Sequence, residues 1–177
     1  KTVAAPLLTH ATVRIGLAQI NPVVGDIASN STRVSRVYID AVERGCEVLA
    51  FPELVLTGYP PEDLVLKSGF VTDNIAALEA FAATTTSCAA VVGFVDRVGD
   101  ELFNAAAICA HGRVQGVYHK QLLPNYSVFD EQRYFSAGKD FSLFRINGAL
   151  MGVTICEDIW DPSGPVATQA RAGAVLN

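Results

Sequence analysis

Residues 141–158 of the chain read FSLFRINGALMGVTICED. Asn147-Gly148 separates two apolar runs, and an Asn-Gly pair in this setting is the strongest short signal for a two-residue β-hairpin turn. Residues 141–146 and 149–155 are therefore expected to be antiparallel strands. The second run leads directly into Cys156, so this hairpin is expected to deliver a thiol at a strand end.

Strand-like and helix-like segments alternate through the rest of the chain. Strands are expected at residues 13–20, 47–51, 89–95, 102–110 and 113–119, with a tight turn at 111–112. Asn30 or Ser31 is expected to cap a first helix that ends at Gly45. The apolar face of that helix would consist of Val34, Val37, Tyr38, Ala41 and Val42.

Three further segments complete the pattern. A second amphipathic helix is expected over residues 71–82, and Asp161-Pro162 is expected to start another helical stretch that ends near Gly173. Residues 174–176 would begin a last strand. Between them, residues 120–137 form a long segment with little periodicity but four aromatic side chains, which favours an ordered functional loop over disorder.

This alternation indicates a single α/β domain of two stacked sheets with helices outside. Alternation alone could equally indicate a doubly wound parallel sheet. The two tight antiparallel turns favour a mixed sheet instead. Half of the 177 residues are hydrophobic, which is enough for a sizeable core.

Three chemically distinct groups follow apolar, strand-like runs: Glu53, Lys120 and Cys156. A thiol attacks a carbonyl carbon as the thiolate, so it needs a base that accepts its proton. A carboxylate can be that base, and an ammonium can stabilise the oxyanion that forms. The three residues are therefore the candidate nucleophile, base and anion stabiliser of an acyl-transfer site.

Each of these residues also has an ordinary interpretation. Glu53 and Lys120 could be solvated surface charges, and Cys156 could be a buried structural cysteine. Only their joint occurrence favours chemistry. Cys46, Cys88 and Cys109 keep the structural interpretation, because no Cys-x-x-Cys pair and no His at ligand spacing supports a metal site.

The sequence around these positions resembles the nitrilase, or carbon-nitrogen hydrolase, superfamily, with its Glu-Lys-Cys triad. Within it, the stretches LTGYPPEDL at 56–64 and YHKQLLPNYSVFDEQRYF at 118–135 are similar to the glutaminase domain of glutamine-dependent NAD synthetases. The resemblance runs from about Val13 to Asn177. It implies a nitrilase-like four-layer αββα sandwich with mixed sheets, truncated at the C-terminus. Residues 1–12 would then be an N-terminal extension and 13–177 an incomplete domain, with the synthetase domain absent.

The resemblance also implies roles for individual residues. Glu53 would be the general base, Lys120 the oxyanion partner and Cys156 the nucleophile. The backbone N–H of Glu157 would be a second oxyanion donor, Tyr126 would contact glutamine, and Glu131 would be a supporting acid, although an ordinary loop carboxylate is about as good an interpretation of Glu131.

The implied function is hydrolysis of L-glutamine to glutamate and ammonia through a cysteine thioester. The glutaminase step needs no cofactor or metal, whereas ATP and Mg belong to the synthetase domain, where ammonia amidates deamido-NAD. One alternative is a free-standing amidase, nitrilase or carbamoylase of the same superfamily. Another is an inactive, truncated structural module, whose open sheet edge would invite association.

Composition limits the remaining possibilities. Thirteen basic and eighteen acidic residues give a net charge of -5 without a basic cluster, so nucleic acid is not an expected partner. No apolar run approaches the ~20 residues of a membrane span. Unpaired cysteines agree with a reducing cytoplasm, and the resemblance favours a homo-oligomer without fixing its size.

Overall fold

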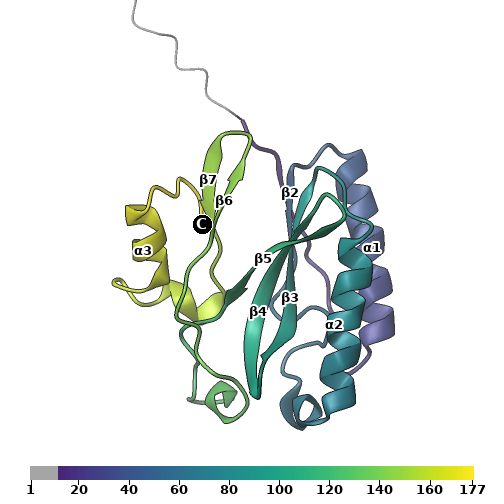
Figure 1. The fold of residues 1–177 in the computed structure, drawn as a ribbon, viewed down its shortest axis with the longest axis vertical. Coiled ribbons are helices and arrows are strands. Elements are labelled where there is room, and N and C mark those ends of the chain that lie inside the picture. Colours follow the sequence, from purple (N-terminus) through teal and green to yellow (C-terminus); the bar gives the residue numbers. More distant parts are fainter. Residues whose placement is uncertain (1–11) are drawn as a thin grey trace, which may run out of the picture.

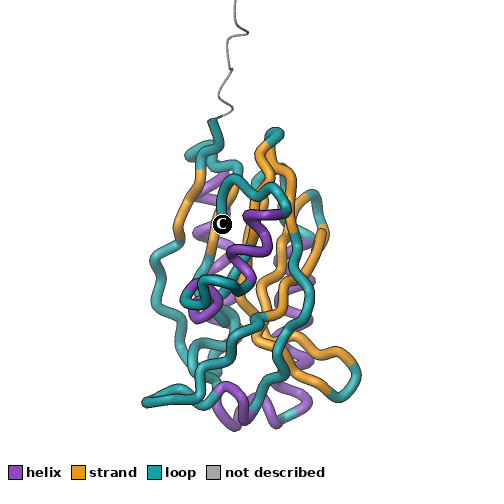
Figure 2. Tube along the Cα trace, turned by 90° about the vertical axis from the view of Figure 1, so that its left-hand side faces the viewer, coloured by secondary structure: helices purple, strands orange, loops and turns teal. Residues whose placement is uncertain are grey.

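The protein is described by a computed structural model over residues 12–177. Its elements form four layers, shown in Figure 1: the helices α1 and α2 cover one face of a five-stranded sheet, a two-stranded hairpin lies across the other face, and α3 lies outside that hairpin. Figure 2 gives the view turned by 90°. The predicted mixed α/β sandwich is therefore confirmed.

The larger sheet has the strand order β1-β2-β3-β4-β5. Its first three strands run parallel, and its last three form antiparallel pairs. The strand bounds are β1 Ile15–Leu17, β2 Val48–Ala50, β3 Ala89–Val98, β4 Glu101–Ala110 and β5 Arg113–His119. The strands β1 and β2 are shorter than the sequence predicts, and β3 is longer.

The helices α1 (Ile27–Glu43) and α2 (Ser68–Ala82) cover the sheet. The sequence places the start of α1 wrongly, because Asp26 is the N-cap and its side chain accepts a hydrogen bond from the Ser29 N–H at 3.1 Å. Asn30 lies inside the helix, buried, and binds the backbone of Val23 instead. Val42 is also misassigned, since it is exposed.

The core lies between these helices and the sheet. Tyr38 of α1 and Phe81 of α2 meet edge to face with their ring centroids 5.4 Å apart. The Tyr38 hydroxyl donates to the carbonyl of Cys88 at 2.9 Å, so this large buried side chain has its polar end satisfied. Cys88 and Cys109 are buried in this core, as the structural interpretation expects.

The hairpin layer consists of β6 (Leu143–Ile146) and β7 (Ala149–Gly152). The Asn-Gly turn is confirmed, but β7 ends three residues before Ile155 because the chain then turns towards the single-turn 3-10 helix η3 (Cys156–Ile159). The helix α3 (Pro165–Arg171) begins later than predicted. Leu176 forms a parallel bridge with Met151, so the predicted last strand is present as a single bridge.

Most of the predicted N-terminal extension, residues 1–12, lies outside the described residues. In the part of the chain that is described, no helix is both long enough and apolar enough to cross a membrane.

Candidate active site

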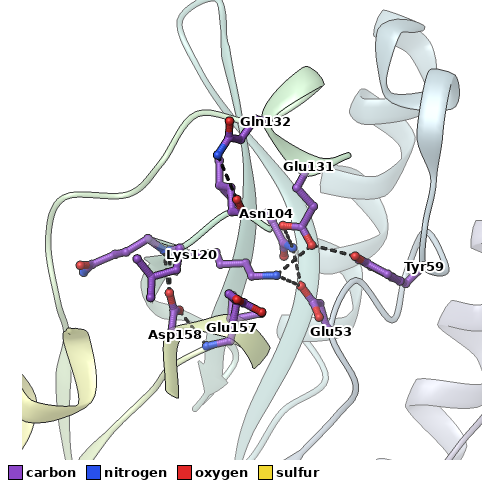
Figure 3. Close-up of polar contacts among 12 residues, drawn as sticks. Glu53, Tyr59, Asn104, Lys120, Glu131, Gln132, Glu157 and Asp158 are labelled. Carbon is purple, nitrogen blue, oxygen red and sulfur yellow. Dashed lines mark hydrogen bonds and ion pairs between the residues drawn. The ribbon is translucent and has the colours of Figure 1, made fainter. Parts of the chain in front are cut away.

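A buried cluster of charges lies where the larger sheet meets the loops that follow β2 and β5. Lys120, the first residue after β5, is only 1% exposed. Its Nζ donates to Oε1 of Glu53 at 2.6 Å and to Oε1 of Glu131 at 2.8 Å. Figure 3 shows the ammonium pointing between the two carboxylates. The structure thus brings three predicted site residues into direct contact.

Two neutral side chains complete the cluster. The Tyr59 hydroxyl donates to Oε1 of Glu131 at 2.8 Å. The Asn104 amide, from β4, donates to Oε1 of Glu53 at 2.6 Å and to Oε2 of Glu131 at 3.3 Å. Buried carboxylates are costly unless they are paired and hydrogen-bonded, and these contacts meet that requirement.

The charge states in the cluster follow from these contacts. Burial opposes the charge of Lys120, but the attraction of Glu53 and the hydrogen bonds to both glutamates outweigh it and raise the pKa of the ammonium, which stays protonated. Burial also raises the pKa of Glu53, and here it outweighs the opposing effects of Lys120 and Asn104. A raised pKa means that this carboxylate binds a proton more readily than a solvated glutamate does, which suits a general base.

Cys156 lies at the start of η3 in a turn with a φ of 45°. This left-handed conformation is uncommon for a residue with a side chain, and such residues cluster at functional sites. The residue is exposed, whereas Cys88 and Cys109 are buried. Partial desolvation and the charge of Glu53 raise the pKa of its thiol, so attack by the thiolate requires a base.

Cys156 and Glu53 line the same cavity, which has a volume of about 670 Å³. The cavity lies between the two sheets, and most of its other lining residues are apolar. Its walls include Val91 of β3, Ala106 of β4 and Phe144 of β6. A thiol and a carboxylate therefore face a mainly apolar space, where electrostatic interactions are stronger than in bulk water.

Asp158 hydrogen-bonds to two segments at once: the one just before Cys156 and the one just after Lys120. It is fully buried and accepts four hydrogen bonds: Oδ1 from the backbone N–H groups of Gln121 and Leu122, at 3.0 and 2.8 Å, and Oδ2 from the Ile155 N–H and the Tyr118 hydroxyl, at 3.0 and 2.7 Å. The segments after Lys120 and before Cys156 are thereby held at fixed positions relative to each other.

The close approach of the Glu53 segment to the sheet depends on Gly93 of β3. A Cβ atom at this position would lie 2.6 Å from the Pro52 carbonyl oxygen, which is too close for any real contact. A glycine here lets the backbone that carries Glu53 pack directly against the strand.

The two other residues predicted to bind substrate pair with each other. The Tyr126 hydroxyl donates to both carboxylate oxygens of Glu157, at 3.0 and 2.9 Å, and both side chains are outside the buried cluster. Tyr126 is 56% exposed. Its ring packs on Phe129, which in turn contacts Tyr59, so an aromatic row links this pair to the cluster.

Sequence reasoning misses three residues of this site: Tyr59, Asn104 and Asp158. A polar residue inside the otherwise apolar run 102–110 is the signal that could have found Asn104. Asp158 directly follows the candidate nucleophile and its neighbour, but a carboxylate there reads equally well as surface charge.

In this mixed α/β sandwich a cysteine and a glutamate line one cavity, and a buried lysine pairs with that glutamate. This arrangement defines a class of thiol-dependent hydrolases that act on carbon-nitrogen bonds. Family comparison agrees: the carbon-nitrogen hydrolase family matches residues 14–176. The chain belongs to this family.

Among its relatives, the glutamine-dependent NAD(+) synthetase of Thermotoga maritima is 44% identical over 158 residues, which are 88% of this chain and 27% of that protein. The solved glutamine-dependent NAD+ synthetase of Acinetobacter baumannii, in complex with ADP, superposes with a TM-score of 0.86 at 36% identity over 90% of this chain and 30% of that one. An amidase from Nesterenkonia sp. gives a TM-score of 0.80 at 25% identity, over 92% and 62% of the two chains. The chain thus spans less than a third of the length of the two synthetases.

Proposed function

We propose that this chain hydrolyses L-glutamine to glutamate and ammonia as the glutaminase component of a glutamine-dependent NAD synthetase. The observation that carries the proposal is that Glu53, held in the buried cluster with Lys120 and Glu131, lines the same cavity as Cys156. The chain that contains this arrangement is 44% identical to such a synthetase.

In the first half of the reaction, Glu53 takes the proton of the Cys156 thiol, and the sulfur adds to the carboxamide carbon of glutamine. Lys120 and the backbone N–H of Glu157 stabilise the oxyanion. Glu53 then returns its proton to the nitrogen as the carbon-nitrogen bond breaks, and ammonia leaves behind a thioester.

In the second half, Glu53 removes a proton from a water molecule that attacks the thioester carbon. The thiolate leaves, recovers its proton from Glu53, and glutamate is released. Glu131 remains a supporting acid that fixes Lys120. Tyr126 and the Glu157 carboxylate would contact the polar end of glutamine, since they lie beside the site and outside its buried part.

The remaining parts of the proposal concern the synthetase reaction. The glutaminase step uses no cofactor or metal, whereas ATP and Mg would serve a separate synthetase domain on which ammonia amidates deamido-NAD. We further propose that the protein acts in the cytoplasm as a homo-oligomer.

Ammonia release by the full-length protein tests the proposal. Glutamine should be hydrolysed in preference to simple aliphatic amides and N-carbamoyl compounds, and Glu53→Gln should lower kcat by at least ~10²-fold. Glu79→Gln, the same change at an exposed position of α2, is the matched control. A preference for simple amides would support the amidase alternative, for which the Nesterenkonia enzyme is a structural precedent. No turnover of any substrate would support a structural role.

A further inference from the structure

Asn104 is a buried amide in the middle of an apolar strand. It is 1% exposed, with Phe103 and Ala105 as buried neighbours on β4. Side chains on one strand face recur every second residue, so Asn104 shares its face with Ala106 and Ile108, which line the cavity. Burying an amide at such a position costs free energy of folding unless its polar atoms are hydrogen-bonded.

Three contacts connect Asn104 to the charged cluster. Its Nδ2 donates to Glu53 and Glu131, and its backbone carbonyl accepts the Lys120 N–H at 2.8 Å. Carboxylates only accept hydrogen bonds, so the amide must turn its NH₂ group to them. Within residues 12–177, its own Oδ1 then has no donor. A residue that breaks a local rule in this way is expected at a functional site.

The consequence falls on Glu53. Its Oε1 accepts from both Lys120 and Asn104, each at 2.6 Å, and no donor in the described chain reaches its Oε2. One oxygen is therefore fixed and the other is left for proton transfer. We infer that Asn104 is a positioning residue that fixes Oε1 of Glu53, so that Oε2 acts as the base towards the thiol and the hydrolytic water. This inference rests on the proposed function.

The electrostatic surroundings of Glu53 come from four other elements. Lys120 follows β5, and Glu131 begins the short 3-10 helix η2 (Glu131–Arg133). Cys156 begins η3, and Tyr59 lies in the loop after β2. Burial raises the pKa of Glu53, while Lys120 and the Asn104 hydrogen bond both oppose that rise. Loss of the Asn104 donor should therefore raise the pKa of Glu53 further.

Asn104→Leu removes the donor at nearly constant size. Hydrogen bonds to charged groups support a loss in kcat of about 10- to 100-fold, and the acid limb of the kcat/KM profile should move up by roughly one pH unit. KM for glutamine should change less than about 3-fold, because Asn104 contacts the base and not the substrate. A merely structural defect would lower the amount of active protein and leave the limb in place.

Asn74→Leu is the matched control. Asn74 of α2 is also fully buried, but its amide binds the backbone of Val95 instead of a carboxylate. This variant should lose stability and keep the parent pH profile. Asn104→Asp is the second variant, because it preserves shape and replaces the donor with a third acid. It should shift the limb at least as far as Asn104→Leu.

The pH dependence of iodoacetamide alkylation at Cys156, measured in the full-length protein, separates this inference from the proposed function. Alkylation needs no glutamine, and its acid limb should move with the base in the same direction as that of kcat/KM. If the parent protein shows no glutaminase activity but the acid limb of Cys156 alkylation still shifts in Asn104→Leu, the proposed substrate is refuted and the role of Asn104 is retained. An unshifted limb in both Asn104 variants would overturn that role.

Discussion

Replacement of Lys120 by Met provides the sharpest test of the buried cluster. The Lys120 side chain is 0% exposed and the side chains of its partners Glu53 and Glu131 are 18% and 5% exposed. Breaking a buried ion pair by removing one partner costs about 3–5 kcal/mol, because the remaining charge is left uncompensated. For a domain of this size, such a loss lowers Tm by about 6–20 °C.

The loss should also depend on pH. Without Lys120, the buried Glu53 carboxylate faces Glu131 with no counter-ion, so its folded pKa rises further above the unfolded value of about 4.3. The folded state then holds a proton that the unfolded state releases. Stability therefore falls as pH rises from about 4 through the raised pKa, and the deficit relative to the parent should be larger at pH 8 than at pH 4.

Urea unfolding of the full-length protein between pH 4 and 8, followed by circular dichroism, measures this difference, and ammonia release gives the accompanying loss of at least ~10²-fold in turnover. Lys139→Met, the same change at an exposed position of the same loop, should stay within about 0.5 kcal/mol of the parent. A Lys120→Met variant with parent stability at every pH, or with parent turnover, would contradict the assignment of Lys120 as counter-ion to both carboxylates.

Three further predictions concern other parts of the site. Iodoacetamide should label Cys156 ahead of Cys88 and Cys109, whose pKa values burial raises to about 11 and about 12, and mass spectrometry of digests showing equal labelling would refute the nucleophile assignment. Gly93→Ala should push the backbone around Glu53 away from β3 and lower kcat by ~10²-fold. A crystal structure of this variant would test the displacement, and Gly69→Ala, at a position with open space around it, is the control. Asp158→Ala should lower both stability and turnover, because each buried donor that loses its acceptor costs about 1–3 kcal/mol. Parent-like hydrogen exchange at residues 121–122 would contradict the role of Asp158 in holding this segment.

Local patterns are sufficient to predict where the chain turns. The Asn-Gly pair and the His111-Gly112 turn carry positive-φ glycines, Gly148 and Gly112, so their chemistry fixes the two hairpins without tertiary information. The ends of the apolar runs are visible for a similar reason, because these runs stop where polar or charged residues begin, although the hydrogen-bonded strands β1, β2 and β7 end earlier than the runs do. Glu53, Lys120 and Cys156 all stand at or near the ends of such runs, so the local pattern is enough to select them.

Helix starts are harder to predict, since several polar residues compete for each cap. Asn30 has good capping chemistry, yet the loop at Val23 uses its amide and Asp26 takes the cap. Asp161 binds the N–H and hydroxyl of Ser163 and so forms a turn of its own. The helix α3 therefore begins only at Pro165.

The partners of the buried charges are beyond local patterns altogether. Asn104 reaches Glu53 across 51 residues of sequence and Glu131 across 27, and Lys120 reaches Glu53 across 67. The register of β4 against β5 places Asn104 beside Lys120, and packing against Gly93 of β3 brings Glu53 to them. The return of the segment after Lys120 brings in Glu131. A single sequence contains no periodicity that reports such distances, so only the folded chain identifies the donors to the carboxylates.

These distant partners have a consequence for the proposed reaction. At rest, two carboxylates face one ammonium, and the buried net negative charge is shared by the neutral donors Asn104 and Tyr59. Transfer of the thiol proton from Cys156 to Glu53 moves one negative charge from oxygen to sulfur within the same site. The net charge of the site stays constant in this step, and the charge moves from the buried carboxylate to the more exposed sulfur. When the charge passes on to the oxyanion, Lys120 is still available as its partner, because Glu131 alone keeps the ammonium in place. The fixed second carboxylate thus lets the first one change its protonation state during turnover without releasing the lysine.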